Sequence, residues 1–200
     1  VRAVVAAGMR MVLPVSCFDR NKSLTGLMPA RMIESREQCI EKTERLFADY
    51  PGKHAGRLTV SASFRGMNNT SDELILALKA IAERHGAVLQ THACYSYFTR
   101  DSSIAQFGKP EIERLESLGV LDARMLLLHS GWFEPHEVAI LARRKPTLVC
   151  CPSSSLHNGY GNLAVGMHPE LAALGINVSL GADHASSGTV DLVQEMRNCA

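Results

Sequence analysis

The chain has 200 residues, of which 46% are hydrophobic, and its formal net charge is +1. This length and apolar content suit a single domain, residues 1–200, with a sizeable core. The near-neutral charge, without a dense cluster of Lys and Arg, argues against a nucleic-acid partner. No apolar run is long enough to span a bilayer, and the chain does not start with a charged-then-apolar leader, so we expect no membrane partner.

The first half of the chain alternates short apolar strands with helical patterns. In chain order, the patterns predict a helix end at Val1–Gly8, a strand at Met9–Cys17, a loop at Asp19–Ile33, a helix at Ser35–Tyr50, a strand at Leu58–Phe64, a loop at Arg65–Thr70, a helix at Asp72–His85 and a strand at Val88–His92. Ser35 stands three residues before Gln38, which is a capping pattern, and Ser71 is in the position to cap the next helix.

The second half continues the alternation. In chain order, we expect a long loop at Ala93–Lys109, a helix from Pro110 to Gly119, a strand at Met125–His129, a helix at Pro135–Arg144, a strand at Thr147–Cys151, a loop rich in Ser, Asn and Gly after Pro152, a short helix at His168–Leu174, a strand that leads from Asn177 to Asp183 and a helix at Val190–Cys199. Gly and Pro separate most of these segments, as they do between elements of an α/β protein.

The pattern amounts to six strand-then-helix units, which indicates a parallel sheet built from consecutive βα units. A closed barrel of this kind has eight units and typically ~250 residues. The chain starts on a helix-like segment, so the two remaining units would precede it. The sequence therefore predicts an α/β fold, an incomplete (β/α)8 barrel of the TIM type with about strands three to eight present.

Six cysteines occur without the regular spacing of a disulfide framework or a Cys-x-x-Cys zinc pair. They are Cys17, Cys39, Cys94, Cys150, Cys151 and Cys199. Most of them stand in strand-like or helix-like apolar stretches, where a reduced thiol packs as a small hydrophobic group. We interpret them as buried thiols of a cytoplasmic protein.

Three of the predicted strands end in a side chain that binds metals or transfers protons, namely His92, His129 and Asp183. The carboxyl ends of parallel barrel strands share one rim, so these side chains are expected to lie close together. A lone histidine in this position is also compatible with simple core packing. An aspartate directly after a buried strand is costly to desolvate, however, unless a cation or hydrogen-bond donors meet it.

Neutral imidazole and carboxylate together suit zinc or a similar divalent ion. Such an ion lowers the pKa of a bound water towards neutrality and so makes hydroxide available. We expect Asp183 both to ligate the ion and to take the proton from that water. We expect His129 to polarise the substrate or to hold the water in line.

These residues carry a family resemblance. In chain order they are His92, His129, the run Cys151–Pro152–Ser153–Ser154–Ser155, and Gly181–Ala182–Asp183. The order resembles the amidohydrolase superfamily, in particular the branch that holds cytosine and guanine deaminases and the triazine (atrazine, melamine) hydrolases. The resemblance extends from Gly8 to Arg197. It implies a metal-dependent (β/α)8 barrel that hydrolyses C–N or C–Cl bonds of heterocycles.

The resemblance also implies roles for particular residues. His92 and Asp183 correspond to ligands of one divalent ion, zinc or iron, and His129 to the histidine that meets the substrate or the water. Arg65 corresponds to an arginine that meets a ring carbonyl in guanine deaminases; a solvated loop arginine is the alternative. Trp132 is either a wall on which a substrate ring stacks or ordinary packing. Relatives in the family are commonly dimers or larger, so a homo-oligomer is expected when the barrel is complete.

Three features depart from the family pattern. The His-x-His pair of the first strand is absent, so His92 and Asp183 are the only ligands that transfer. Tyr95 stands where deaminases carry a glutamate, and a phenol with a reference pKa near 10 is a poor proton shuttle at neutral pH. His157 and His184 fall where other residue types are usual; we interpret both as loop residues, with substrate contact as the alternative.

The sequence thus favours an enzyme that deaminates or dechlorinates a small nitrogen heterocycle by attack of metal-bound hydroxide. Within enzymes, the alternative is an amide- or peptide-type amidohydrolase on the same fold, which Tyr95 makes more plausible. Outside enzymes, the alternative is a catalytically inactive barrel that serves as a binding or assembly module. Metal content and product analysis separate these three functions.

Overall fold

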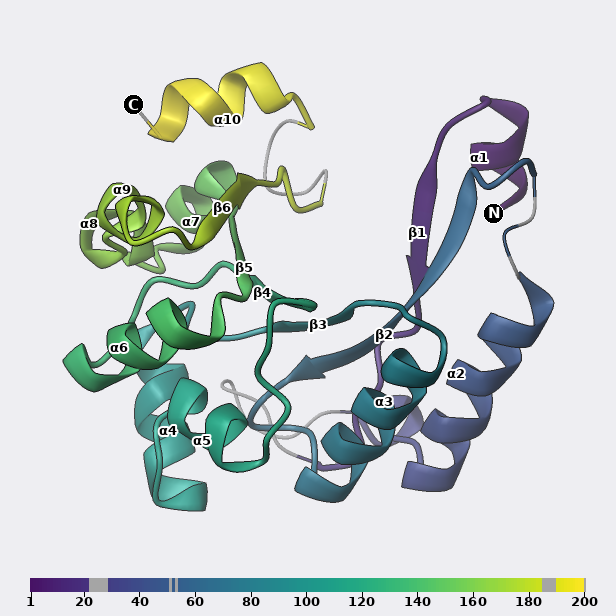
Figure 1. The fold of residues 1–200 in the computed structure, drawn as a ribbon, viewed down its shortest axis with the longest axis horizontal. Coiled ribbons are helices and arrows are strands. Elements are labelled where there is room, and N and C mark those ends of the chain that lie inside the picture. The colour runs from purple at the N-terminus through teal and green to yellow at the C-terminus, as the bar shows by residue number, and fades with distance from the viewer. Residues whose placement is uncertain (22–28, 51, 53, 185–189, 200) are drawn as a thin grey trace. The chain divides into compact units, whose positions relative to one another are not determined.

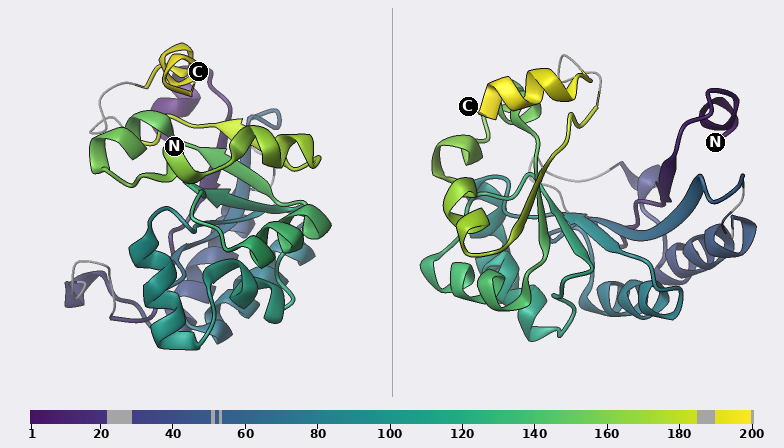
Figure 2. Two further views of the ribbon diagram at one scale, coloured as in Figure 1. Left: turned by 90° about the vertical axis from the view of Figure 1, so that its left-hand side faces the viewer. Right: turned by 45° about the horizontal axis from the view of Figure 1, so that its top comes forward.

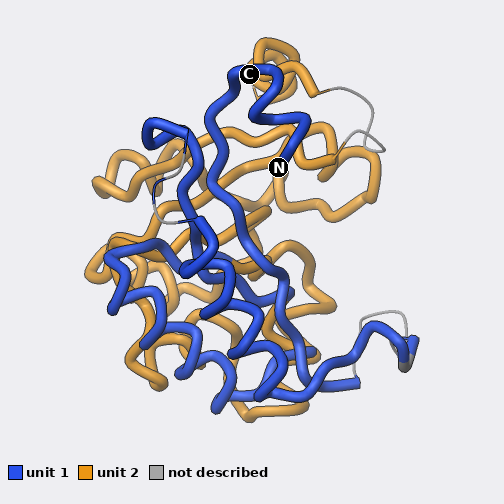
Figure 3. The backbone as a smooth tube through the Cα atoms, turned by 90° about the vertical axis from the view of Figure 1, so that its right-hand side faces the viewer, with its two compact units in different colours: residues 1–65, 69–90 blue, residues 66–68, 91–200 orange. Residues whose placement is uncertain are grey.

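The computed structural model describes residues 1–21, 29–50, 52, 54–184 and 190–199. The chain divides into two compact units (Figure 3). Unit 1 comprises Val1–Arg65 and Asn69–Gln90, and unit 2 comprises Gly66–Asn68 and Thr91–Ala200. That residues 1–200 act as one domain stays a prediction.

Among the described residues, six strands follow one another in sequence order across the sheet (Figure 1). They are β1 (Met11–Pro14), β2 (Leu58–Gly66), β3 (Leu89–His92), β4 (Met125–Leu128), β5 (Thr147–Cys150) and β6 (Asn177–Leu180). The neighbours β1 and β2, β4 and β5, and β5 and β6 pair in parallel. Sequential parallel strands separated by helices are the arrangement that the alternating sequence pattern predicts.

Helices occupy the connections between the strands. They are α1 (Arg2–Ala6), the 3-10 helix η1 (Ala30–Met32), α2 (Arg36–Asp49), α3 (Asp72–Arg84), α4 (Tyr97–Phe107), α5 (Glu111–Ser117), α6 (Pro135–Arg144), α7 (Pro152–Asn158), α8 (Asn162–Val165), α9 (His168–Ala173) and α10 (Leu192–Cys199). None of the helices in the described part of the chain has the length and apolar character needed to cross a membrane.

The predicted caps of α2 and α3 are present. Ser35 Oγ accepts from the Gln38 backbone N–H at 3.2 Å, and Gln38 Oε1 accepts from the Ser35 N–H at 2.8 Å, which together form a capping box. Ser71 Oγ accepts from the Leu74 N–H at 3.2 Å. Each cap satisfies backbone donors that the first helical turn leaves without partners, so both helices begin where the sequence indicated.

In unit 1, α2 and α3 pack against each other beside β2 (Figure 2, right). Leu58, Ala62 and Phe64 lie on one face of β2 and are at most 1% exposed. Leu74 and Leu78 of α3 are fully buried. Strand residues two apart point to the same face, so this alternation directs the larger apolar side chains of β2 into the core.

In unit 2, the core forms between the central strands and α5 and α6. Met125 and Leu127 of β4, Ile112 of α5 and Leu141 of α6 are all fully buried. The helices α4 and α5 are in contact, as are α5 and α6, and α9 packs against β6. Burying side chains of this size stabilises each by about 1.5–3 kcal/mol relative to exposure, so the strands that precede the candidate residues are firmly held.

Two predicted loops prove to contain α-helices. Residues 97–107, inside the predicted loop Ala93–Lys109, form α4, which Ser96 caps by accepting from the Thr99 N–H at 3.4 Å. This helix lacks a continuous apolar stripe, and Phe98 is 57% exposed, so periodicity gave no signal. The predicted loop after Pro152 contains α7 and α8; consecutive serines favour turns by propensity, but in α7 they are buried by tertiary packing.

The structure describes only part of the predicted loop Asp19–Ile33. Residues 22–28 lie outside the described residues. Within the rest of this stretch, Ala30–Met32 form η1. Asp19 lies in unit 1, where its Oδ1 accepts from the backbone N–H of Ser71 at 2.8 Å, so this part of the connection is tied to the start of α3.

Candidate active site

The candidate residues of unit 2 lie at the carboxyl ends of strands. His92 is the last residue of β3, His129 directly follows β4, and Asp183 comes three residues after β6. His129 and Asp183 have left-handed backbone angles, with φ of +64° and +58°. Non-glycine residues rarely adopt such angles, which cost of order 1–3 kcal/mol, and they are enriched at functional sites.

The three side chains come together. The Nε2 of His129 lies 3.9 Å from Oδ2 of Asp183. The ring of His92 stacks on the ring of His129, with 5.3 Å between centroids and 13° between planes. The side chain of His129 is 5% exposed and that of Asp183 is 21% exposed, so the group is largely shielded but reachable from solvent.

The carboxylate of Asp183 is held by a neighbour from α7. Ser154, which is fully buried, donates its hydroxyl to Oδ2 at 2.7 Å. The Nε2 of His184 lies 3.7 Å from the same oxygen, on a side chain that is 60% exposed. His184 therefore lies at the site as well as in a loop, whereas His157 belongs to α7. The serine hydrogen bond fixes the direction in which the carboxylate points.

Backbone hydrogen bonds join the segments that follow β3 and β4. The N–H groups of Gly131 and Trp132 both donate to the carbonyl of Cys94, at 3.0 and 2.9 Å. Cys94 lies two residues after His92, and Gly131 lies two residues after His129. These bonds therefore set the distance between the two histidines through the backbone.

Asn162 of α8 packs against the backbone of His129 and Gly131. Its side-chain amide donates to the carbonyl of His129. A Cβ placed on Gly131 would lie 2.7 Å from the Cβ of Asn162, so this position has no space for a side chain. The backbone around His129 is thus enclosed from the α8 side.

Aromatic side chains surround His129. The rings of Tyr95 and Tyr160 lie 5.1 Å apart, and each faces His129 edge-on, at 6.2 and 6.0 Å. Trp132 donates its Nε1–H to the carbonyl of Tyr160 at 2.8 Å, and Tyr97 meets the Trp132 ring in a T-shaped contact. Such surfaces suit flat rings. Trp132 is joined to this cluster through Tyr160; that it contacts a substrate stays a prediction.

A buried carboxylate supports the segment after His92. Glu111, at the start of α5, is 1% exposed, and its Oε2 accepts from the Cys94 N–H at 2.6 Å. Burial raises the pKa of Glu111 to about 7, although hydrogen bonds from Cys94 and Thr99 oppose the shift. Cys94 itself has a left-handed φ of +53°. The sequence offered no signal for this role, because an acidic residue in a first helical turn is ordinary.

The buried Glu111 carboxyl predicts a specific pH dependence of stability. Its pKa of about 7 in the folded protein exceeds the ordinary glutamate pKa of 4.5, so between these values the native state retains a proton that the unfolded chain releases. Its contribution to the free energy of unfolding therefore falls as pH rises through this interval, by on the order of 3 kcal/mol, and is constant above it. Urea unfolding of full-length wild type and Glu111→Gln across this range measures the difference.

The control for this measurement is Glu73→Gln, an exposed carboxyl in the first turn of α3. This variant should keep the wild-type pH slope, whereas Glu111→Gln should lose part of it. Equal slopes in wild type and Glu111→Gln would show that folding does not raise the pKa of the Glu111 carboxyl.

Arg65 belongs to unit 1. It lies near the end of β2, where its backbone N–H donates to the carbonyl of Cys17 at 2.8 Å. The other candidate residues belong to unit 2. A contact between Arg65 and a ring carbonyl stays a prediction.

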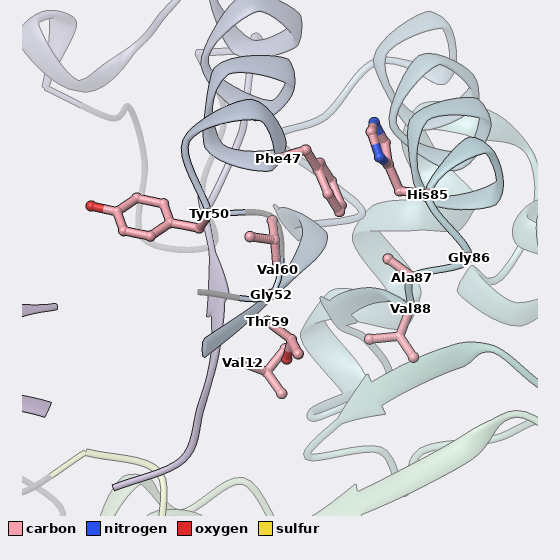
Figure 4. A pocket seen from close by; sticks show the side chains of 10 residues that line it. All are labelled: Val12, Phe47, Tyr50, Gly52, Thr59, Val60, His85, Gly86, Ala87 and Val88. Carbon is pink, nitrogen blue, oxygen red and sulfur yellow. The ribbon is translucent and has the colours of Figure 1, made fainter. Parts of the chain in front are cut away.

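A pocket of about 430 Å³ lies within unit 1 (Figure 4). It is lined by residues at the starts of strands and the ends of α2 and α3, including Phe47 and His85, whose rings stack at 4.2 Å. None of the predicted site residues lines it. Barrel enzymes place their chemistry at the carboxyl ends of strands, so this pocket is not the candidate active site.

The donor set fits part of a metal site. His92 and Asp183 offer an imidazole nitrogen and a carboxylate oxygen, the donors that zinc accepts. Within the described ranges, no three or more His, Cys, Asp or Glu side chains form a group that could hold an ion. Since zinc sites use three or four protein ligands, this part of the protein supplies an incomplete set.

The chain was compared with known proteins. The model of the amidohydrolase family matches residues 1–200. A 5'-deoxyadenosine deaminase from Methanothrix thermoacetophila is 35% identical over 184 residues, which cover 90% of this chain and 43% of the relative. The chain thus spans less than half of that curated relative.

Solved structures show the same fold. A zinc-bound adenosine deaminase from Xanthomonas campestris superposes with a TM-score of 0.82 at 20% identity, covering 98% of this chain and 42% of that one. Atrazine chlorohydrolase from Arthrobacter aurescens, complexed with zinc, gives a TM-score of 0.81 at 19% identity, covering 93% and 40%. The predicted fold, an incomplete (β/α)8 barrel, is confirmed. The family is metal-dependent, in line with the zinc in both neighbours.

Proposed function

The chain belongs to the amidohydrolase family, and we propose that the protein is a metal-dependent hydrolase that deaminates or dechlorinates a small nitrogen heterocycle. The observation that carries the proposal is the convergence of His92, His129 and Asp183, with Nε2 of His129 3.9 Å from Oδ2 of Asp183. A deaminase relative and an atrazine chlorohydrolase neighbour support the two reaction types.

We assign the ion to His92 and Asp183, with further ligands from outside this pair. One zinc or iron ion, when bound, supplies Lewis acidity that brings the pKa of a water molecule towards neutrality. Asp183 would take the proton from the attacking water, and the Ser154 hydroxyl holds its carboxylate in one direction. His129 Nε2 donates to the substrate atom on which negative charge develops.

The aromatic cluster around His129 would bind the heterocycle. Tyr95 and Tyr160 lie edge-on to His129, and Trp132 is hydrogen-bonded to Tyr160; aromatic surfaces of this kind suit a planar substrate. In this proposal Trp132 stacks on the ring, and Arg65 contacts a ring carbonyl through its guanidinium.

Tyr95 also favours a second candidate function. Its ring lies edge-on to His129, at the position where a carboxylate would shuttle a proton to an amine leaving group. A phenol is a weak proton shuttle at neutral pH. A chloride leaving group needs no proton, and an amide substrate would use a different proton path, so dechlorination and amide hydrolysis both suit Tyr95 better than ordinary deamination.

We propose a cytoplasmic location and a homo-oligomeric state for the complete protein, without nucleic-acid or membrane partners. All six cysteines are free thiols, which suits a reducing compartment. The formal net charge of +1 offers little attraction for a polyanion.

The full-length protein should be assayed against amino- and chloro-substituted heterocycles and against small amides and dipeptides. Release of ammonia or chloride from heterocycles, together with stoichiometric zinc or iron, is the expected result. Turnover of amides alone would support the second candidate. A protein that contains no metal and hydrolyses none of these compounds would be an inactive barrel and would contradict the proposal.

A further inference from the structure

Two cysteines lie close together where the last turn of α10 approaches the end of β5. The sulfur of Cys199, in the last turn of α10, lies 3.9 Å from the sulfur of Cys150, the last residue of β5. The two residues are 49 positions apart in the chain. Cys150 is fully buried, whereas Cys199 is the one exposed cysteine of the six. The pair thus combines an exposed residue with a buried one.

Hydrogen bonds from two other residues of α10 hold this helix against the start of α7. Glu195 is fully buried, and its Oε2 accepts from the Ser153 backbone N–H at 2.8 Å. The Asn198 side-chain amide donates to Ser153 Oγ at 2.9 Å. Ser153 is followed by Ser154, which donates to Asp183. The helix therefore holds the segment that orients the carboxylate of the candidate site.

We propose that Cys150 and Cys199 are a thiol modification site, in which a peroxide oxidises the pair to a disulfide that locks α10 onto the end of β5. A disulfide requires the sulfurs to approach to about 2.05 Å. Rotation of the Cys199 side chain supplies the movement, because this residue is exposed in the final turn of its helix. The bond would close a long loop, which restricts the unfolded chain and stabilises the folded one.

The reaction balances with hydrogen peroxide as the oxidant. The Cys199 thiolate attacks one peroxide oxygen, the O–O bond breaks, and hydroxide leaves. The hydroxide combines with the proton that the Cys199 thiol released and becomes water. Cys199 is then a sulfenic acid. The Cys150 sulfur attacks the Cys199 sulfur, the S–O bond breaks, and the hydroxyl leaves as water with the Cys150 proton. Two thiols lose two hydrogens, and one peroxide becomes two waters.

The order of the two steps follows from exposure. Burial raises the pKa of the Cys150 thiol well above its ordinary value, and the neighbouring Cys199 adds to the shift. A buried neutral thiol reacts slowly with peroxide, because the thiolate is the nucleophile. Cys199 therefore reacts first, and Cys150 resolves the sulfenic acid across the 3.9 Å contact.

The test treats full-length protein with hydrogen peroxide and maps its peptides by mass spectrometry. The expected result is one intramolecular link between the Cys150 and Cys199 peptides, with a loss of two hydrogens. Dithiothreitol should reverse it. The thermal midpoint should rise by a few degrees on oxidation and return on reduction. Cys199→Ser should show neither the link nor the rise, and it changes only an exposed position, so its folding is not at risk.

Cys94 provides an internal control, because it is 1% exposed and no second thiol is paired with it among the described hydrogen bonds. It should stay reduced in the same sample. Sulfinic acid at Cys199 with a free Cys150 thiol would overturn the proposal. An intermolecular Cys199 dimer, or equal oxidation of the Cys94 thiol, would also overturn it.

Discussion

Replacing Asp183 by asparagine in the full-length protein should lower kcat/KM by at least ~10³-fold, because the variant loses both a metal ligand and the proton acceptor. Asparagine keeps the size of the side chain and can still accept the Ser154 hydrogen bond, so the fold should persist. Bound metal should fall together with activity. Steady-state kinetics and elemental analysis of the same preparations measure the two losses.

The control for Asp183 is Asp49→Asn, at the end of α2. Asp49 is 56% exposed and pairs with Arg45 one helical turn away at 3.6 Å. This change neutralises a carboxylate without touching the candidate site, so activity and metal content should remain at wild-type values. An Asp183→Asn protein that retains wild-type turnover would contradict the proposed mechanism.

Replacing His129 by glutamine should separate chemistry from metal binding. We expect kcat to fall by ~10²–10³-fold, because the imidazole Nε2 no longer stabilises developing charge or positions the water. Metal content should stay unchanged, because the proposed ligands are His92 and Asp183. A loss of kcat without a loss of bound metal therefore distinguishes the role of His129 from that of Asp183.

His136→Gln is the matched control for His129. His136 lies on α6, is 54% exposed, and pairs with Glu113 at 3.2 Å. Its replacement should leave kcat and metal content unaltered. Loss of metal in His129→Gln would show instead that this histidine is a ligand, and wild-type kinetics in that variant would remove it from the mechanism.

The residues that end strands could be predicted from sequence because their placement follows from two simple regularities. Apolar runs of β-strand length mark β3, β4 and β6, and parallel order brings their carboxyl ends to one edge. His92, His129 and Asp183 terminate these runs. No contact between distant residues had to be known for this inference, and the structure places the three side chains together.

The supporting residues depend on contacts that the sequence does not encode locally. Glu111 accepts a hydrogen bond from the backbone N–H of Cys94, a residue 17 positions away in the chain. Tyr160, between two glycines, is brought to Trp132 by a hydrogen bond over 28 positions. No periodicity marks such pairs, since each partner is ordinary in its own segment. The same reason explains α4 and α7, whose sequences have weak helical patterns: α4 is stabilised by its Ser96 cap, and α7 by the burial of its serines.

The most direct test of the account is anomalous X-ray scattering at the zinc edge from crystals of the full-length protein. The proposed function requires one peak about 2.0–2.2 Å from an imidazole nitrogen of His92 and from a carboxylate oxygen of Asp183, with His129 beside the same ion. A peak elsewhere in the protein, or side chains of His92 and Asp183 too far apart to share one ion, would contradict it.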